Sequence, residues 1–451
     1  MNTVQDVQVI KTDEGAKNGQ SKCPNCGSTD ISMNPNTGKL RCNYCRTQFE
    51  PETAEELVEN IEDLYGEVIA SGASNMDASA EQMITLKCQS CGADVVIDTE
   101  SSTQARCHWC RSMLSINQQI PNGAVPDSVL PFKLKKQDAQ ICIQNFVKKR
   151  SFFANPKFKT DFTTENIMGV YFPYMLVDAN AHAYLAGKGE QQTRRYKIDD
   201  RTYYDADVFD VTREFDITVD DLTIESSADK LDYHKDDKTN NIINSIMPFD
   251  TENCVKWDSN YLRGYTSEKR DTDIDVLKPI VDKQLKGIAK FSIKDTISSY
   301  DRGVRWETEQ LELKGRSWTS TYLPVWLYSY METKSNGKKV LHYVAVNART
   351  KETMGSVPIH IPKLLGVSGI VEAFGGFLTS LDLFEEDAIF LLSGFVFYFI
   401  MWLRYRNAGA RHTYEKETKT NVKNVRKEDR FIKELKRLRN SNIEGRNDNT
   451  L

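Results

Sequence analysis

The hydrophobic pattern divides the chain into segments of different period. Alternation of apolar and polar positions, typical of β-strands, dominates residues 165–360. Apolar residues at three- and four-residue steps predict helices over 138–150 and 273–289, and an amphipathic helix over the acidic stretch Glu50–Glu67. The apolar positions of this pattern are Leu57, Ile61, Leu64 and, directly after the stretch, Val68. The pattern therefore predicts an α+β fold that is rich in β-structure.

Two local signals refine the β-rich part. Asn336-Gly337 separates two alternating runs and predicts a hairpin with a type I′ turn. Residues 171–176 (YFPYML) and 322–327 (YLPVWL) echo one another, which predicts two related strand units. Both units lie in one expected α+β cytoplasmic domain over 130–360.

The C-terminal quarter contains two apolar segments, 364–384 and 388–404, separated by the acidic loop 385–387. Residues 388–403 reach about 24 Å as a helix, which is short for a bilayer core of about 30 Å. Glu372 in the first segment would cost about 2.5–3.5 kcal/mol on insertion. We expect a transmembrane helical hairpin over 361–404. An interfacial first helix and a buried second helix are the alternatives.

The tail over 405–451 is basic, and its charge sets the expected topology. Counted from Arg404, it has 14 Lys and Arg against 7 Asp and Glu. The positive-inside rule then puts both flanks of the hairpin in the cytosol. Helical spacing predicts an amphipathic helix in the tail, either on an anionic leaflet or against a partner protein. Its apolar positions are Val425, Phe431, Ile432, Leu435 and Leu438.

Composition excludes several classes of protein. The 451 residues are 39% hydrophobic and 27% charged, which fits neither a polytopic membrane protein nor a disordered chain. A net charge of −5 gives no bulk attraction for polyanions. Ten cysteines are too few for a disulfide scaffold. Residues 1–20 have no apolar run of the signal-peptide kind, so we expect the cysteine-rich end to be cytosolic and reduced.

A repeat of cysteine pairs is the clearest chemical signal. Residues 22–27 (KCPNCG) recur as 87–92 (KCQSCG), and 41–46 (RCNYCR) recur as 106–111 (RCHWCR). Each C-x2-C-x15-C-x2-C set has the spacing of a structural zinc site. We predict two rubredoxin-like zinc ribbons, over 20–50 and 84–116, joined by an acidic helix and linker over 51–80. The ligands of two structural Zn²⁺ ions would be Cys23, Cys26, Cys42 and Cys45, and Cys88, Cys91, Cys107 and Cys110.

The residues around these pairs lead to further expectations. Gly27 and Gly92 follow the first pairs, where a left-handed backbone is often required. Arg46 and Arg111 stand at the equivalent places after the second pairs. Each carries about 1 kcal/mol of strain if its φ is positive, or its guanidinium offsets the thiolate charge. His108 is expected on the surface. Disulfides and a redox C-x-x-C pair are the alternatives to zinc.

The role of the ribbons has two candidate interpretations. Tyr44 and Trp109 could stack on bases, and several Lys and Arg residues flank the knuckles, as in nucleic-acid binders. The acidic stretch between the ribbons would repel phosphate, so a structural or protein-docking role is favoured. No P-loop, dinucleotide or metalloprotease motif occurs. Pairs such as Asp220-Asp221 look like solvated turns, and we expect no enzyme, no catalytic residue and no small-molecule substrate.

Several segments together resemble a known bacterial family. They are 88–111, 127–134 (DSVLPFKL), the helix ending at Arg150, 169–178 (GVYFPYMLVD), 323–327 (LPVWL) and 342–347 (HYVAVN). This order is similar to that of the TFIIB-type zinc-ribbon-containing proteins. The resemblance implies a membrane-attached cytoplasmic protein, in some members associated with envelope-stress systems that contain phage-shock-type and flotillin-like (SPFH) proteins.

These expectations combine into one hypothesis. The chain would be a non-enzymatic scaffold or adaptor in the cell membrane, with its N-terminal domains and C-terminal tail in the cytoplasm. It would bind the lipid bilayer and cytoplasmic protein partners. The alternative is a nucleic-acid-binding or regulatory zinc-ribbon protein tethered to the membrane.

Overall fold

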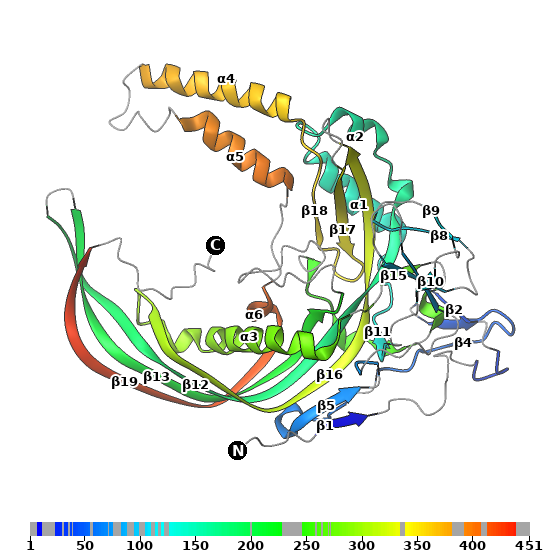
Figure 1. Cartoon of the computed structure of the whole chain (residues 1–451), viewed down its shortest axis with the longest axis horizontal. Coiled ribbons are helices and arrows are strands. Elements are labelled where there is room, and N and C mark those ends of the chain that lie inside the picture. The colour runs from blue at the N-terminus through cyan, green and yellow to red at the C-terminus, as the bar shows by residue number, and fades with distance from the viewer. Residues whose placement is uncertain are drawn as a thin grey trace.

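The computed structural model is a mixed α+β protein built on one large, curled β-sheet (Figure 1). It describes residues 7–10, 23–28, 31–34, 37, 39–54, 57–70, 72–74, 83–87, 94–98, 104–109, 113–115, 119–120, 126–198, 201–227, 246–257, 259–262, 265–268, 270, 272–333, 339–380, 392–406 and 413–438.

The short strands are β1 (Val7–Ile10), β2 (Ile31–Met33), β3 (Leu40–Cys42), β4 (Gln48–Phe49), β5 (Gly66–Ala70), β6 (Met83–Lys87), β7 (Asp94–Asp98), β8 (Gln104–Arg106), β9 (Met113–Ser115), β10 (Gln119–Ile120), β11 (Ser128–Val129), β14 (Val255–Lys256), β15 (Thr266–Glu268), β17 (Lys339–Asn347) and β18 (Thr353–Gly355). The long strands are β12 (Met168–Ile198), β13 (Arg201–Glu225), β16 (Val304–Thr333) and β19 (Lys419–Leu438).

The α-helices are α1 (Lys136–Lys148), α2 (Pro156–Asp161), α3 (Ile274–Ser292), α4 (Ile361–Ser380), α5 (Ser393–Arg406) and α6 (Tyr414–Glu417). The 3-10 turns are η1 (Ile61–Asp63), η2 (Thr164–Asn166), η4 (Thr251–Asn253), η5 (Ser259–Leu262) and η6 (Lys294–Ile297). Helices α1 and α3 confirm the helices predicted over 138–150 and 273–289.

The four long strands form an arch in the order β16-β12-β13-β19, with every neighbouring pair antiparallel (Figure 1). Its concave side carries α3, whose buried face includes Leu277, Val281 and Leu285. These side chains pack on the alternate inward residues of β12 and β13, such as Ala181 and Ile217. The alternating sequence pattern thus reflects a sheet with one buried face.

The two echoing segments pair directly with each other. In the β12–β16 ladder, Tyr171 lies opposite Pro324 and Pro173 lies opposite Tyr322. Each tyrosine also has a parallel neighbour on its other side, β15 beside β12 and β11 beside β16. The repeat seen in the sequence is therefore a local two-fold relation at the centre of the sheet.

Both prolines stand where an outer neighbour ends. The carbonyl of Pro173 accepts from Ser226 N, just after β13, and that of Pro324 accepts from Ala348 N, just after β17. A strand residue's N and C=O point to the same side, so each proline nitrogen also faces outward, beyond the last ladder pair. Proline has no N–H to donate, and at these two positions no ladder hydrogen bond requires one. The missing donor therefore costs little, which explains how both prolines fit into central strands.

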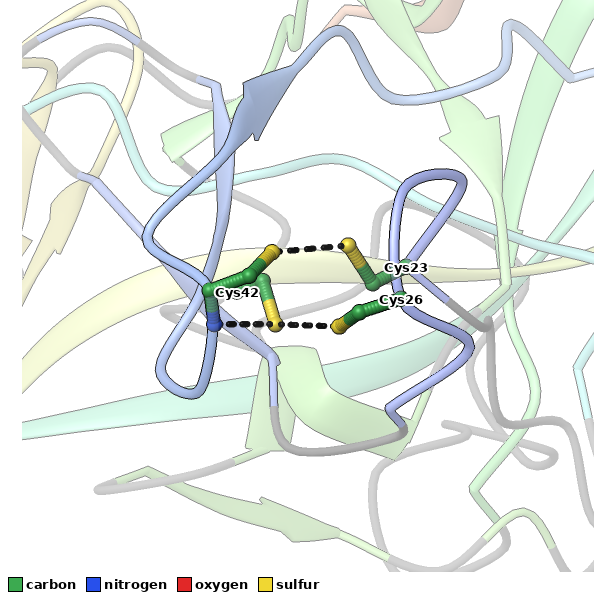
Figure 2. Close-up of side chains that lie close together, drawn as sticks. Cys23, Cys26 and Cys42 are labelled. Carbon is green, nitrogen blue, oxygen red and sulfur yellow. Dashed lines mark hydrogen bonds between the residues drawn. The ribbon is translucent and has the colours of Figure 1, made fainter.

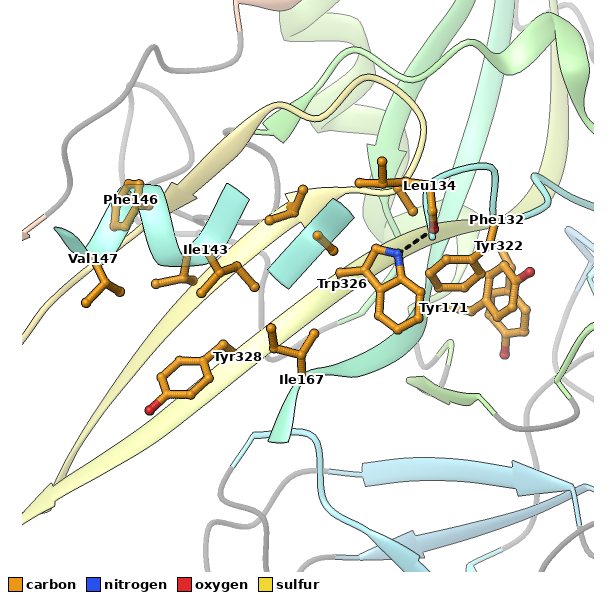
Figure 3. Packing of buried hydrophobic residues seen from close by; sticks show 14 of the residues in the cluster. Phe132, Leu134, Ile143, Phe146, Val147, Ile167, Tyr171, Tyr322, Trp326 and Tyr328 are labelled. Carbon is orange, nitrogen blue, oxygen red and sulfur yellow. Dashed lines mark hydrogen bonds between the residues drawn. The ribbon is translucent and has the colours of Figure 1, made fainter. Parts of the chain in front are cut away.

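A second core lies where α1 covers the other end of the sheet (Figure 3). Ile143 and Phe146 of α1 are buried in it, together with Phe132 and Trp326. Phe132 and Trp326 rings meet edge to face at 5.0 Å. Trp326 Nε1 donates to Leu134 O at 2.9 Å, which satisfies the one polar group of that side chain.

The acidic stretch Glu50–Glu67 does not form the predicted amphipathic helix. Its described residues form an irregular segment, the single turn η1 and the start of β5. Gly66 has φ +71°, which ends any helical continuation. Strand β5 pairs in parallel with β16, and the buried Glu67 reaches Arg316 Nη2 at 3.1 Å. Tertiary pairing overrides the helical spacing.

The tail is also a strand, so the amphipathic helix predicted there is wrong. Strand β19 pairs with β13 along its length. β13 contains eight acidic and two basic residues, a net −6, and β19 contains eight basic and three acidic, a net +5. The fully buried Arg213 of β13 binds Asp429 through both carboxylate oxygens, at 2.5 and 3.1 Å. The net charges thus match the basic tail to an acidic strand of its own chain, while this one ion pair has the opposite polarity, with its cation on β13 and its anion on β19.

Within the described residues, one helix is long and apolar enough to cross a membrane, over Ile361–Thr379 in α4. Helix α5 packs against α4 but has 14 described residues, and 381–391 lie outside the described part. The structure thus supports one candidate span, where the sequence predicted the two spans 364–384 and 388–404. The hairpin strands predicted around Asn336-Gly337 are confirmed as β16 and β17, while the turn itself lies outside the described residues.

Candidate metal centre and acidic cavity

Four cysteines from two loops converge near the N-terminus. Cys23 Sγ lies 3.5 Å from Cys45 Sγ, and Cys26 Sγ lies 3.5 Å from Cys42 Sγ. All four sulfurs lie within 4.8 Å of one another. Figure 2 shows Cys23 and Cys26 on one loop facing Cys42 on the other. Tetrahedral zinc with Zn–S bonds of about 2.3 Å places its sulfurs ~3.8 Å apart, so this set can hold one zinc ion.

The two loops have the same backbone geometry. Gly27 N donates to Cys23 O at 2.8 Å, and Arg46 N donates to Cys42 O at 2.9 Å. The φ values of Gly27 and Arg46 are +71° and +65°. The left-handed position expected after both cysteine pairs is therefore present in both. Arg46 holds it at a cost of about 1 kcal/mol.

The neighbours of the sulfurs favour thiolates in part of the cluster. The Thr47 hydroxyl, 3.2 Å from Cys45 Sγ, and the Thr47 backbone lower the pKa of Cys45 to about 5. The Ser28 backbone N–H acts to lower the pKa of Cys26, but desolvation and the other sulfurs raise it to about 12. Four thiols this close cannot all ionise without a cation, because the thiolates repel one another. A bound metal ion would remove that repulsion.

The first cysteine set is fixed to the sheet domain on one side and open on the other. Ile31 and Leu40 of its small sheet are buried in the same core as η5. Tyr44, between Cys42 and Cys45, is 81% exposed, and Arg41 and Arg46 are exposed beside it. The loop that carries the ligands therefore presents an aromatic and cationic surface to solvent.

The second cysteine set lies mostly outside the described residues. Of its predicted ligands, Cys107 is described and buried, while Cys88, Cys91 and Cys110 are not described. Cys107 shares a core with Phe172. A second cluster of cysteines is absent from the part of the chain that the structure describes.

Two expectations about the second loop are wrong. His108 was expected on the surface, yet it is buried, with its ring 5.8 Å from the ring of Phe172. Trp109 was a candidate stacking surface, yet it is 2% exposed and its Nε1 donates to Glu268 Oε1 at 2.9 Å. The apolar side of the central sheet takes up both rings, so neither is available to a base.

The described residues also form an acidic cavity of about 500 Å³. Asp178, Asp220 and Asp221 line it, with carboxylate oxygens within 4.8 Å of one another. Asp221 has φ +54°, and its N–H donates to Asp178 Oδ1 at 2.9 Å. The doublet was expected to be a solvated turn. It instead stands at a bulge of the β12–β13 ladder, beside a cavity that residues 57–62 also line.

The surroundings of Asp221 disfavour its charge. Burial raises its pKa to about 7, the Thr251 hydroxyl opposes this by donating at 2.6 Å, and the negative charges of Asp178 and Asp220 add to the rise. This carboxyl therefore titrates near neutral pH. One signal in the sequence could have indicated this site. In a regular strand every second residue faces inward, and the adjacent aspartates Asp220 and Asp221 interrupt that alternation.

Comparison with known proteins gives one relative of note. The chain is 27% identical over 363 residues to the uncharacterized protein YdjG of Bacillus subtilis (strain 168), a match that covers 79% of this chain and 95% of that protein. No protein-family model matches the chain, and no solved structure does. The relative's name assigns no activity, so the site must be interpreted from its own chemistry.

We predict that Cys42→Ser lowers the zinc content of the purified chain by one equivalent. Loss of one of four thiolates opens the tetrahedron, and affinity for zinc falls steeply. Metal analysis by mass spectrometry measures the change. Cys142→Ser is the matched control, because Cys142 lies in α1 away from the cluster, and it should keep the parental zinc content. Unchanged zinc in Cys42→Ser would contradict the assignment.

The raised pKa of Asp221 predicts a pH dependence of stability. Between pH ~4 and ~7 the folded chain keeps a proton on Asp221 that the unfolded chain has released, so the free energy of unfolding falls as pH rises and levels off above pH ~7. Asp221→Asn should remove this slope and stabilise the chain at pH 7.5, by at most a few kcal/mol. Urea unfolding at several pH values tests it. The exposed Asp275→Asn should keep the wild-type slope.

Proposed function

We propose that this protein is a non-enzymatic, membrane-anchored zinc-ribbon scaffold that docks cytoplasmic proteins at the inner face of a bacterial cell membrane, in an envelope-stress system. The observation that carries the proposal is an apolar helix pair, α4 and α5, attached to a sheet domain that also holds a four-cysteine centre. The likeness to TFIIB-type zinc-ribbon proteins is part of this proposal.

The attachment of the helix pair supports a hairpin anchor. His360 N, just before α4, donates to Phe153 O, and Phe153 N donates to the Tyr405 hydroxyl at the end of α5. Arg150 Nε donates to Arg404 O at 3.1 Å. The chain thus enters α4 and leaves α5 at one place. If α4 crosses a bilayer, the chain must return, and both flanks then stay on the same side.

The surfaces of these helices fit a lipid environment. Ile370 is 71% exposed, and Phe374 of α4 and Phe395 of α5 are also largely exposed. Glu372, the one acidic residue of α4, accepts from Gly394 N at 2.6 Å. The carboxylate therefore meets the positive end of α5, which offsets part of its cost in an apolar medium. Trp402 lies near the base of α5, where interfacial aromatics are favoured.

The metal centre supports docking by rigidity. A structural zinc ion fixes two loops with no open coordination position, so it contributes no chemistry of its own beyond holding the fold. Tyr44 and Arg41 are then presented on a fixed surface, and aromatic and arginine side chains are the residue types that dominate protein interfaces. The burial of Trp109 removes one of the two base-stacking rings that the nucleic-acid alternative would use.

The membrane half of the proposal predicts the behaviour of lysine substitutions on α4. Ile370→Lys with Phe374→Lys should move the chain from the membrane pellet to the supernatant, because each buried lysine costs about 2.5–3.5 kcal/mol in a bilayer. Fractionation after high-salt washing measures this. The control, Ile141→Lys with Val276→Lys, changes exposed apolar residues of α1 and α3 and should stay in the pellet. A double variant that still pellets with membranes would contradict the anchor.

The docking half predicts that Tyr44→Ser with Arg41→Ser reduces the proteins that co-purify with the detergent-solubilised chain by about tenfold or more, with zinc retained. Quantitative mass spectrometry measures the co-purified proteins. Tyr65→Ser is the matched control, since Tyr65 is equally exposed but lies outside the ribbon. If nuclease treatment removes what co-purifies, the nucleic-acid alternative holds and the docking function is wrong.

A further inference from the structure

The arch of long strands has two edges without a strand partner in the described residues. On one side, β19 pairs with β13 alone. On the other, residues 304–314 of β16 pair with β12 alone, because β5 joins only from Gly315. Unpaired edges of this length are templates for another strand. Phe431 of β19 is 51% exposed, which adds an apolar group to one edge.

The two edges carry opposite charge. β19 has a net charge of +5, whereas residues 304–313 contain three acidic residues and one basic, a net −2. β13 shows which kind of strand β19 binds in this fold, since that neighbour has a net charge of −6. An acidic strand is therefore the expected partner for the outer edge of β19.

The strand pairings align residues of the two edges in rows that cross the sheet from β16 through β12 and β13 to β19. Two edge residues in the same row are called level with each other, and two such pairs have opposite charge. One row across the sheet runs Glu312, His182, Asp216, Lys423, so an acid at one edge is level with a lysine at the other. A second row begins at Glu309 and ends at Lys427. Within the chain, Glu309 also binds Lys290 of α3 at 3.0 Å and Lys423 contacts Glu62, so a partner strand would share these charges.

Two more rows place an apolar residue at each edge, whereas one row places two cations opposite each other, which disfavours the contact. Leu313 is level with Val422, and Val304 is level with Phe431. Arg305 is level with Arg430, but Arg305 Nη2 already pairs with Glu307 Oε1 at 3.1 Å. The unfavourable row is thus partly neutralised within the chain.

We propose that this edge pair joins copies of the chain head to tail, with β19 of one copy adding to the 304–313 edge of the next. Because β16, β12, β13 and β19 alternate in direction, two copies in the same orientation bring these edges together antiparallel, as in every other pair of the arch. The contact is heterologous and repeats from copy to copy. All copies then present α4 and α5 on the same side, as a shared membrane would require.

The same charges oppose the symmetric contacts. Two β19 edges would place +5 against +5, and two 304–313 edges would place acid against acid. Like charges directly opposite one another destabilise a strand pair. Among pairings of this chain with itself, the head-to-tail contact is the one that the charges favour.

Cysteine cross-linking in membranes tests the proposal. Thr308 and Glu428 end one row of the sheet, so Thr308→Cys with Glu428→Cys should give a ladder of dimers, trimers and larger species on mild oxidation. Each single variant should match the parent chain, and a mixture of the two should stop at dimers. Dimers from Glu428→Cys alone would show a symmetric contact and overturn the proposal. So would a double variant without a ladder at normal zinc content.

Charge reversal in the double-cysteine background supplies the matched comparison. Lys427→Glu should reduce the ladder at least tenfold, because Lys427 is level with Glu309. Lys433→Glu on the same strand should leave it unchanged, because Lys433 is level with Glu190, beyond the end of the β12–β16 pairing. Raising the salt concentration should weaken the parental ladder. Equal effects of the two reversals would overturn the proposal.

Discussion

The antiparallel pairing of β12 with β16 is the constraint on which the rest of the structure depends. It runs from Met168↔Leu327 to Gly189↔Val304, and β13 pairs with β12 on its other side and in turn carries β19. Arg316 of β16 connects it to two further elements, with Nη2 3.1 Å from Glu67 of β5 and Nη1 2.9 Å from Asp282 of α3. Desolvation would raise the pKa of Glu67, but Lys278 and Arg316 hold it below its ordinary value. The buried carboxylate is stable only in this assembled arrangement.

The sequence predicts those features whose cause is local. The 3.6-residue period of α1 and α3 comes from one buried face per helix, and the cysteine spacing reflects the geometry of one loop. The positive φ of Arg46 was likewise predictable, since the first loop requires the same position for Gly27. In each case the stabilising partners lie within a few residues, so the pattern contains the information.

The failures share one physical reason, which is pairing between distant segments. Residues 419–438 have helical apolar spacing, but their eight cations meet the acidic β13 some 200 residues away. Residues 50–67 have the same spacing, but the edge of β16 and the ion pair of Glu67 decide their backbone. The doublet Asp220-Asp221 looks like a turn in the sequence, but the partners of Asp221, Asp178 of β12 and Thr251 beyond the end of β13, lie 30 or more residues away. The local preference of a residue for a helix amounts to about 0.5 kcal/mol or less. The hydrogen bonds and side-chain contacts of a ladder between distant strands contribute more than that per residue.

Charge complementarity along strands is the feature that links the fold to the proposed assembly. Inside the chain it favours β19 as the neighbour of β13, where Arg426 of β19 lies 3.6 Å from Glu214 of β13. At the outer edge most of the cations of β19 are exposed to solvent, and natural proteins use lysine there to prevent random edge pairing. A basic edge excludes most strands but admits an acidic one. The chain supplies such a strand at residues 304–313, so the device that prevents aggregation also specifies one partner.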